Sequence, residues 1–189
     1  MTDGLPEFRA FSKIPRLFRD IRIYEKIDGT NATVGIFASA DEFTVLAGQR
    51  TMWVRWPYGP DNYGFGKWVK EHAEELKQLG PGFHRGEWYG AGIQRGYGLK
   101  EKRFALFEPP KDGVVPACCQ VVPLLFQGPF TTTWVRAALE RLRSDGSALV
   151  PGYTKPEGIV VYHEASGQRF KVTLENDEKP KGVPNGPMC

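Results

Sequence analysis

The chain has 189 residues, of which 25% are charged and 13% are aromatic, and its formal net charge is +3. This length suits one domain that buries a core of its own. The mildly basic charge is compatible with a polyanionic partner such as nucleic acid. No apolar stretch approaches the ~20 residues that span a bilayer, and the N-terminal residues do not read as a signal peptide. We therefore expect a cytoplasmic protein with no membrane association.

The three cysteines do not form the framework of a disulfide-rich protein. Cys118 and Cys119 are adjacent in the chain, and Cys189 is its last residue. This spacing argues for a reducing compartment. The sequence has no CxxC pair and no His-Cys cluster, so we expect no structural zinc site.

Short alternating runs rich in β-branched and aromatic residues predict strands along most of the chain. In chain order the pattern predicts strands over 21–24, 32–37 and 43–47, a helix over 68–79, strands over 86–89, 103–107 and 120–126, a helix over 131–145, and strands over 158–162 and 169–174. Strands with two interspersed helices indicate an α+β fold with mainly antiparallel sheets.

Both helices carry signals for where they end. The first has apolar residues on one face up to Leu79, and Gly80-Pro81 follows it. The second begins at a run of three threonines, whose hydroxyls suit an N-cap, and Asp145-Gly146 ends it. We see no internal boundary, so residues 1–189 are expected to form one domain, with a loose Pro/Gly-rich tail over 179–189.

The segment 25–31 places a lysine directly before an Asp-Gly pair, between two of the expected strands. A lysine amine at such a turn suits nucleophilic attack on a phosphorus atom, because the glycine lets a ligand approach the backbone. An ordinary β-hairpin with an Asp-Gly turn and a solvated lysine explains the same residues. Lys26 by itself therefore leaves both interpretations open.

Four further segments carry candidate functional residues. Glu87 lies at a strand end before a glycine-rich loop, and Phe104 and Phe107 offer rings that can stack on a base. Glu157 precedes a very apolar strand and offers oxygen ligands to a divalent metal. Lys171 lies within a strand, where a phosphate is a plausible partner. Each residue also has an ordinary structural explanation. Glu87 is then a surface carboxylate, and Phe104 and Phe107 are core rings. Glu157 is then a solvated charge at a strand end, and Lys171 is an exposed lysine.

In this order, the segments resemble the covalent nucleotidyltransferase superfamily of ATP-dependent DNA and RNA ligases and mRNA capping enzymes. The superfamily's lysine motif KxDG matches residues 26–29. In the nick-sealing type of phage RNA ligase the longer motif EKIxGTN matches residues 25–31, and the pattern GExxGxGIQ of that branch matches residues 86–94. The resemblance covers roughly residues 24–178. It implies an adenylation domain with mainly antiparallel sheets flanked by helices.

The resemblance also implies a role for each residue of the lysine motif. Lys26 would take AMP from ATP as a lysyl phosphoramidate and release pyrophosphate, so the implied cofactors are ATP and Mg²⁺ or Mn²⁺. Glu25 would lie beside the adenine. Asn31 and Arg50 would contact the sugar or the phosphate end of the nucleic acid.

The later motifs receive their roles in the same way. Glu87 would hold the ribose hydroxyls, and Phe104 would stack on the adenine, with Phe107 as the competing choice. Glu157 would help to bind the divalent cation. Lys171 would contact the α-phosphate and take part in catalysis.

Two departures from the family pattern bear on the activity. Many relatives carry a second lysine two residues after the first in the last motif, where this chain has Thr173. About eighteen residues follow Lys171, so we expect no C-terminal OB domain, and an accessory protein or domain would supply substrate grip.

The resemblance predicts a minimal ATP-dependent RNA ligase and favours RNA over DNA as its nucleic acid. The alternatives are an ATP-dependent DNA ligase, a capping-type guanylyltransferase, and a nucleotide or nucleic-acid binding module without catalysis.

Overall fold

The computed structural model describes residues 7, 9–39, 42–175 and 177, and it contains two β-sheets. Sheet A has the order β7 (Leu124–Pro129), β1 (Asp20–Lys26), β8 (Gly158–His163), β9 (Gln168–Thr173). Sheet B has the order β3 (Phe43–Gly48), β2 (Thr30–Ala38), β4 (Gly82–Gly90), β5 (Lys102–Leu106), β6 (Cys119–Val121). All neighbouring strands are antiparallel except β5 and β6. The predicted α+β fold with mainly antiparallel sheets is confirmed.

Helix α3 (Thr132–Asp145) covers sheet A and begins where the threonine run predicts. The Thr131 hydroxyl oxygen accepts a hydrogen bond from the Trp134 N–H at 3.3 Å, and Gly146 ends the helix with a φ of 81°. The apolar face of α3, which includes Leu142, packs against Ile21 of sheet A. This amphipathic packing explains why the helix lies along the sheet.

The other predicted helix lies on sheet B but is divided. Helix α1 (Phe65–Glu71) ends at His72, whose φ of −106° and ψ of 14° are not helical, and α2 (Ala73–Leu76) and a 3₁₀ turn (Lys77–Leu79) follow. Two further 3₁₀ turns occupy Asn62–Gly64 and Gly96–Gly98. The division does not interrupt the apolar face, because side chains from both helices pack in one core cluster with sheet B.

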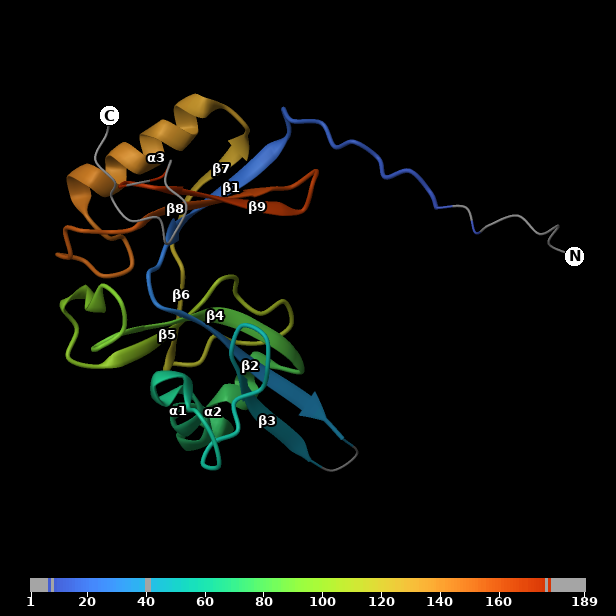
Figure 1. The fold of residues 1–189 in the computed structure, drawn as a ribbon, viewed down its shortest axis with the longest axis vertical. Helices are drawn as coiled ribbons and strands as arrows, with labels where there is room; N and C mark the ends of the chain where they lie inside the picture. Colours follow the sequence, from blue (N-terminus) through green and yellow to red (C-terminus); the bar gives the residue numbers. More distant parts are fainter. Residues whose placement is uncertain (1–6, 8, 40–41, 176, 178–189) are drawn as a thin grey trace, which may run out of the picture.

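Figure 1 shows the resulting layers, with α3 on one side, α1 and α2 on the other, and the two sheets between them. A third apolar cluster, which includes Ile27, Tyr89 and Tyr97, lies where the sheets meet. No helix in the part of the chain described above is long and apolar enough to cross a membrane. The tail predicted over 179–189 lies outside the described residues.

The chain crosses from sheet A to sheet B between Lys26 and Thr30. β1 and β2 therefore belong to different sheets and do not pair, so the simple β-hairpin interpretation of this segment is wrong. Gly29 is required at the crossing because a Cβ there would collide with the carbonyl oxygen of Trp88 in β4. The glycine thus serves close approach to the backbone of sheet B.

Replacing the N-cap of α3 gives a test of this architecture. We expect Thr131→Ala to lower the free energy of unfolding by about 1 kcal/mol, because the Trp134 N–H loses its acceptor. Chemical denaturation measures the change. Thr131→Ser keeps the hydroxyl and should stay close to the parent protein, and equal stability of the alanine and serine variants would contradict the assignment.

Candidate active site

Lys26 is the last residue of β1, and its amine forms an ion pair. Nζ donates a hydrogen bond to Oε2 of Glu157 at 2.7 Å, and the two side chains are 20% and 6% exposed. Glu157 directly precedes β8, in which Gly158 lies opposite Lys26. The pairing of β1 with β8 thus brings together two predicted site residues that are 131 positions apart in the chain.

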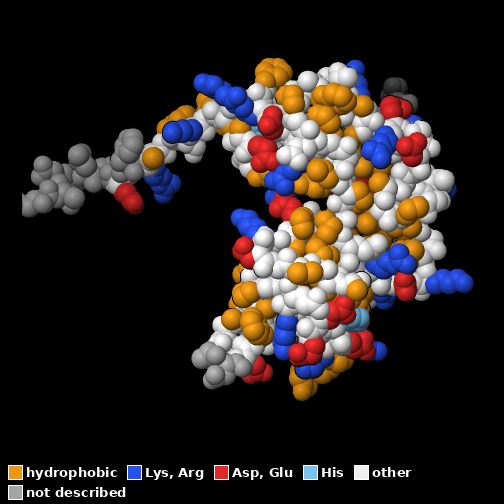
Figure 2. All heavy atoms as spheres, turned by 180° about the vertical axis from the view of Figure 1, so that it is seen from behind, with side chains coloured by type: hydrophobic (Ala, Val, Ile, Leu, Met, Phe, Trp, Pro, Cys, Tyr) orange, Lys and Arg blue, Asp and Glu red, His pale blue; other side chains and the backbone are white. Residues whose placement is uncertain are grey.

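A polar cavity of about 450 Å³ opens beside Lys26. Its lining residues are Lys26, Asp28, Gly29, Thr30, Asn31, Gln49, Arg50, Thr51 and Glu87. Four of them, Lys26, Asn31, Arg50 and Glu87, were predicted from the sequence. Figure 2 shows acidic and basic side chains gathered where the molecule narrows between its two halves.

Glu87 and Asn31 reach the cavity because side chains alternate across sheet B. Trp88 of β4 packs in the core beneath α1, so Glu87 points to the opposite face of the sheet. Asn31 of β2 lies directly opposite Glu87 in the register. One face of sheet B therefore packs on α1 and α2, and the other carries the polar side chains of the cavity.

Glu87 is nearly buried and accepts a hydrogen bond from the Gly29 N–H at 3.2 Å. Burial raises the pKa of Glu87 to about 7, although the charge of Lys26 and the Gly29 N–H favour its ionised form. The nearby carboxylates of Glu157 and Asp28 raise it further. This carboxyl group therefore changes charge near neutral pH.

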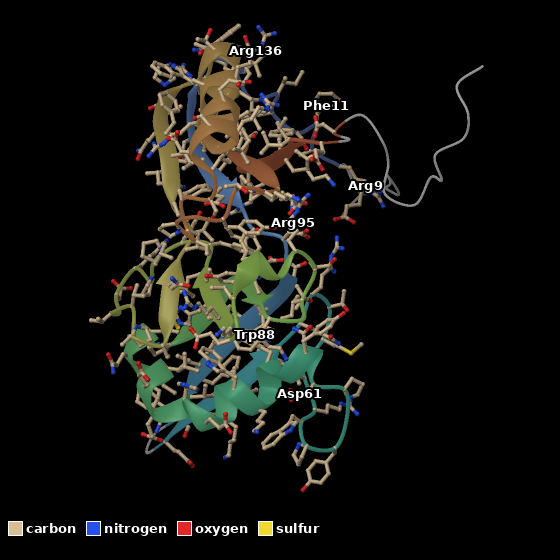
Figure 3. The ribbon with its side chains drawn as sticks, turned by 90° about the vertical axis from the view of Figure 1, so that its left-hand side faces the viewer. Arg9, Phe11, Asp61, Trp88, Arg95 and Arg136 are labelled. Carbon is tan, nitrogen blue, oxygen red and sulfur yellow. The ribbon has the colours of Figure 1, made fainter. Side chains whose placement is uncertain are left out.

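Arg95 holds the crossing segment in place. Its Nε donates to Oδ2 of Asp28 at 3.1 Å, and its NH1 donates to the carbonyl oxygen of Lys155 at 3.2 Å. The Asp28 N–H donates to the hydroxyl of the buried Tyr97 at 2.8 Å. Figure 3 shows Arg95 at the level between the two sheets. One guanidinium thus connects the segment after Lys26 with the segment before Glu157.

Arg95 and Tyr97 were not among the residues predicted for the site. Both residues directly follow the glycine-rich loop after Glu87. That loop is the signal that could have found them, because a tight glycine-rich loop beside a candidate carboxylate positions the residues after it.

Glu25 lies on the opposite side of β1 from Lys26 and is 1% exposed. Its Oε2 accepts hydrogen bonds from the N–H groups of Ala148 at 2.8 Å and Leu149 at 2.9 Å. Oε1 is buried with no partner among the described residues, and burial raises the pKa of this carboxyl group. Glu25 does not line the cavity, but it offers an unpaired acceptor one residue from Lys26.

Phe104 lies in β5 and Phe107 directly follows that strand, and their rings point to opposite faces of sheet B. Phe104 is fully buried and packs against Phe65, Trp68 and Trp88 in the core beneath α1. No face of its ring is available to a base, so the structure does not support the predicted stacking role of Phe104. Phe107 is half-buried on the other face and packs at the junction of the sheets, and it remains the candidate.

Lys171 lies on β9 and is exposed. It lies opposite Val160 of β8, which lies opposite Tyr24 of β1, so by alternation it shares a sheet face with Lys26. Thr173 occupies the row of Lys26 itself, and its hydroxyl donates to the carbonyl oxygen of Glu175 at 2.9 Å. Lys171 thus lies on the same face of sheet A as Lys26, two strands and about 10 Å across the sheet from β1.

A family model described as RNA ligase matches residues 19–173. The match includes every predicted site residue and both sheets. The chain belongs to the RNA ligase family. A comparison with curated proteins finds no match.

Solved structures of an RNA ligase from Naegleria gruberi share the fold of this family member. An arginine-to-alanine mutant with ATP and Mn gives a TM-score of 0.57 at 20% identity, covering 84% of this chain and 51% of that one. The same RNA ligase with PPi gives a TM-score of 0.55 at 20% identity, covering 89% and 57%. This RNA ligase family chain therefore spans about half the length of the relative that it matches.

The raised pKa of Glu87 predicts how the stability of this RNA ligase family chain depends on pH. The native carboxyl group titrates at about 7, above the value of 4.5 for a free glutamate, so the native state binds the proton more tightly. The resulting stabilisation is complete below about pH 4.5 and is lost as the pH rises through 7. From about pH 4.5 to about pH 8, we expect the unfolding free energy of the parent to fall by about 3 kcal/mol relative to Glu87→Gln.

Denaturant titrations at several pH values measure this difference. The matched control is Glu42→Gln, which changes an exposed carboxylate between β2 and β3 and should track the parent protein at every pH. A constant difference between the parent and Glu87→Gln across the range would show that Glu87 does not titrate near neutral pH.

Proposed function

We propose that this chain is an ATP-dependent RNA ligase domain that forms a covalent lysyl-AMP intermediate at Lys26 and transfers AMP to a 5′-phosphate of RNA. The observation that carries the proposal is the Lys26 amine, held 2.7 Å from Glu157 at the wall of a polar cavity that Glu87 and Asn31 also line. The family match supports the reaction class. We treat residues 1–189 as one adenylyltransferase domain.

The first step is nucleophilic substitution at the α-phosphorus of ATP. The Lys26 ammonium loses one proton to Glu157 or to solvent, the resulting amine Nζ forms the N–P bond while the P–O bond to pyrophosphate breaks, and a second proton leaves the nitrogen to solvent. Glu157 accepts the hydrogen bond of the amine and so fixes the position of Lys26, which lines the cavity. The Lys171 ammonium, on the same face of sheet A, contributes positive charge for the α-phosphate.

The residues present fit a divalent cation that is held mainly by the substrate. Within the described part of the chain no three His, Cys, Asp or Glu side chains cluster around a common metal position. Mg²⁺ typically binds one or two carboxylates together with phosphate oxygens and water. Glu157 is beside Lys26, and Asp28 and Glu87 line the same cavity; we assign the cation to Glu157. Bound Mg²⁺ or Mn²⁺ would neutralise charge on the phosphates as pyrophosphate leaves. The structure of the Naegleria gruberi RNA ligase with ATP and Mn supports this choice.

The nucleoside of ATP has candidate partners at the junction of the sheets. Phe107 offers a half-buried ring for stacking, and the unpaired Oε1 of Glu25 suits an amino group such as that of adenine. Glu87 suits the ribose hydroxyls, because a carboxylate accepts two hydrogen bonds. Asn31 and Arg50, at the open side of the cavity, suit the sugar and phosphate end of the nucleic acid.

In the later steps, an oxygen of the RNA 5′-phosphate attacks the phosphorus of lysyl-AMP and releases Lys26. A 3′-hydroxyl then attacks the 5′-phosphorus, and AMP leaves. RNA is favoured over DNA because the family model is that of RNA ligases. The proposal includes an accessory protein or domain that helps to bind the substrate.

Labelling with α-³²P-ATP and Mg²⁺ or Mn²⁺ tests the proposal. We expect covalent label on the parent protein and none on Lys26→Ala or Lys26→Arg, because neither variant has the amine. The control is Lys67→Ala, which removes an exposed lysine of α1 and should label like the parent. Equal label on Lys26→Ala would refute the assignment. Preferential label from GTP would indicate a capping-type guanylyltransferase, and ATP binding without label would indicate a binding module.

Arg95 gives a second test, because it positions the segments that carry Lys26 and Glu157. We expect Arg95→Lys to slow labelling about tenfold with little change in ATP affinity, since a lysine cannot contact Asp28 and the Lys155 carbonyl oxygen in the same fork. The matched control is Arg143→Lys, in an ion pair on α3. A labelling rate equal to that of the parent would show that Arg95 does not position the site.

A further inference from the structure

The cavity face of sheet B continues outward into an exposed aromatic surface. Its members are Phe37, Leu46, Trp53 and Phe83, which are 38%, 37%, 38% and 57% exposed. We call these four residues the aromatic platform. Large apolar side chains gathered on one exposed sheet face indicate an interaction site, because isolated exposed apolar residues are ordinary but contiguous ones are not.

The platform is built into the fold. Trp53 is held by an isolated β-bridge to Gly48. Its six-membered ring occupies the space that a side chain at Gly35 or Gly48 would need. Two glycines on neighbouring strands thus let the indole lie against the sheet, and its other surface is left partly exposed.

The rings of the platform are ordered against one another. Trp53 and Phe83 are nearly parallel, with centroids 5.9 Å apart and an interplanar angle of 20°. Phe37 meets both edge-on, at 5.9 Å from Trp53 and 5.5 Å from Phe83. The two parallel rings present a surface of the kind on which nucleic-acid bases stack.

The platform and the cavity lie along the same strand. Phe83, Arg85 and Glu87 of β4 share one face by alternation, so the exposed Arg85 lies between the platform and the cavity. Phe83 and Glu87 are four positions apart, which is about 13 Å at ~3.3 Å per residue. A strand whose bases stay stacked about 3.4 Å apart, the spacing along one strand of duplex DNA, covers this distance with about four nucleotides.

The charges on this face suit a polyanion. Among the residues of β2, β3 and β4 that point to this face, the charged ones are Glu87, inside the cavity, and Arg85. Arg50 lies at the cavity rim, on the bend that leads from β3 to Trp53. Arg50 and Arg85 therefore lie between the cavity and the platform, where they can contact phosphates.

We infer that the aromatic platform binds unpaired nucleotides of the RNA strand whose end is in the cavity, by stacking bases on Trp53 and Phe83. This inference rests on the proposed function, because the RNA end must reach Lys26. Sequence-independent stacking combined with arginine–phosphate contacts is how proteins bind single strands without reading their bases. The platform would contribute to RNA binding and would take no part in catalysis.

Two leucine substitutions test the inference while keeping apolar bulk. We expect Trp53→Leu and Phe83→Leu to bind a fluorescent single-stranded RNA of about twelve nucleotides roughly 5- to 100-fold more weakly in anisotropy titrations. Phe83→Tyr keeps the ring and should bind like the parent. Trp134→Leu, which replaces an exposed tryptophan of α3, is the matched control and should also bind like the parent. Unchanged affinity in both leucine variants would overturn the inference.

The covalent label separates this inference from the proposed function. All four variants should label with α-³²P-ATP at the rate of the parent, because none of the three positions lines the cavity. Loss of RNA binding with normal label supports the platform. A parent protein that never labels, yet binds RNA through the platform, contradicts only the proposed function.

Photocrosslinking and sedimentation test whether RNA or a second copy of this chain binds to the aromatic platform. RNA carrying 5-iodouridine about four nucleotides from its 5′-phosphate should crosslink to Trp53 or Phe83, as mapped by mass spectrometry. Crosslinks confined to other residues would overturn the inference. A dimer of the parent that dissociates in Phe83→Leu, with unchanged RNA affinity, would assign the platform to contact between two copies of this chain and would also overturn it.

Discussion

The ion pair between Lys26 and Glu157 is the interaction on which the site depends. Removing an ammonium and a carboxylate from water costs several kcal/mol per ion, and only close, well-aligned contact offsets the cost. The fold provides that contact because Lys26 ends β1 and Glu157 precedes the neighbouring strand β8. One side of the pair remains open to the cavity, where phosphates can take over the contact with the amine.

The crossing from sheet A to sheet B gives this ion pair its surroundings. In four residues the chain passes from a sheet that supplies the amine to a sheet that supplies Glu87 and Asn31. Gly29 allows the close approach, and Arg95 and Tyr97 hold the Asp28 backbone and side chain. Each sheet packs its outer face on helices, so its inner face is free to carry polar groups without weakening the core.

The local elements were largely predictable, and long-range placement was not. Seven of the eight predicted strand runs and the N-cap at Thr131 follow from alternation and capping chemistry, which act over a few residues. The run predicted over 120–126 is two strands, β6 and β7, that belong to different sheets. The break at His72 and the separation of β1 from β2 were missed, because both depend on packing against distant segments. Phe104 was predicted to stack on the base, with Phe107 as the competing choice, and the register of β5 buries Phe104.

By itself, the sequence determined the class of fold, the order of the motifs and the family resemblance, because each is carried by short runs with their own local chemistry. The tertiary structure decided which side chains share a site. It placed Lys26 against Glu157, put Lys171 two strands away on the same face, and introduced Arg95 into the site. These are contacts between residues tens to more than a hundred positions apart, and only strand register and the packing of the two sheets define them.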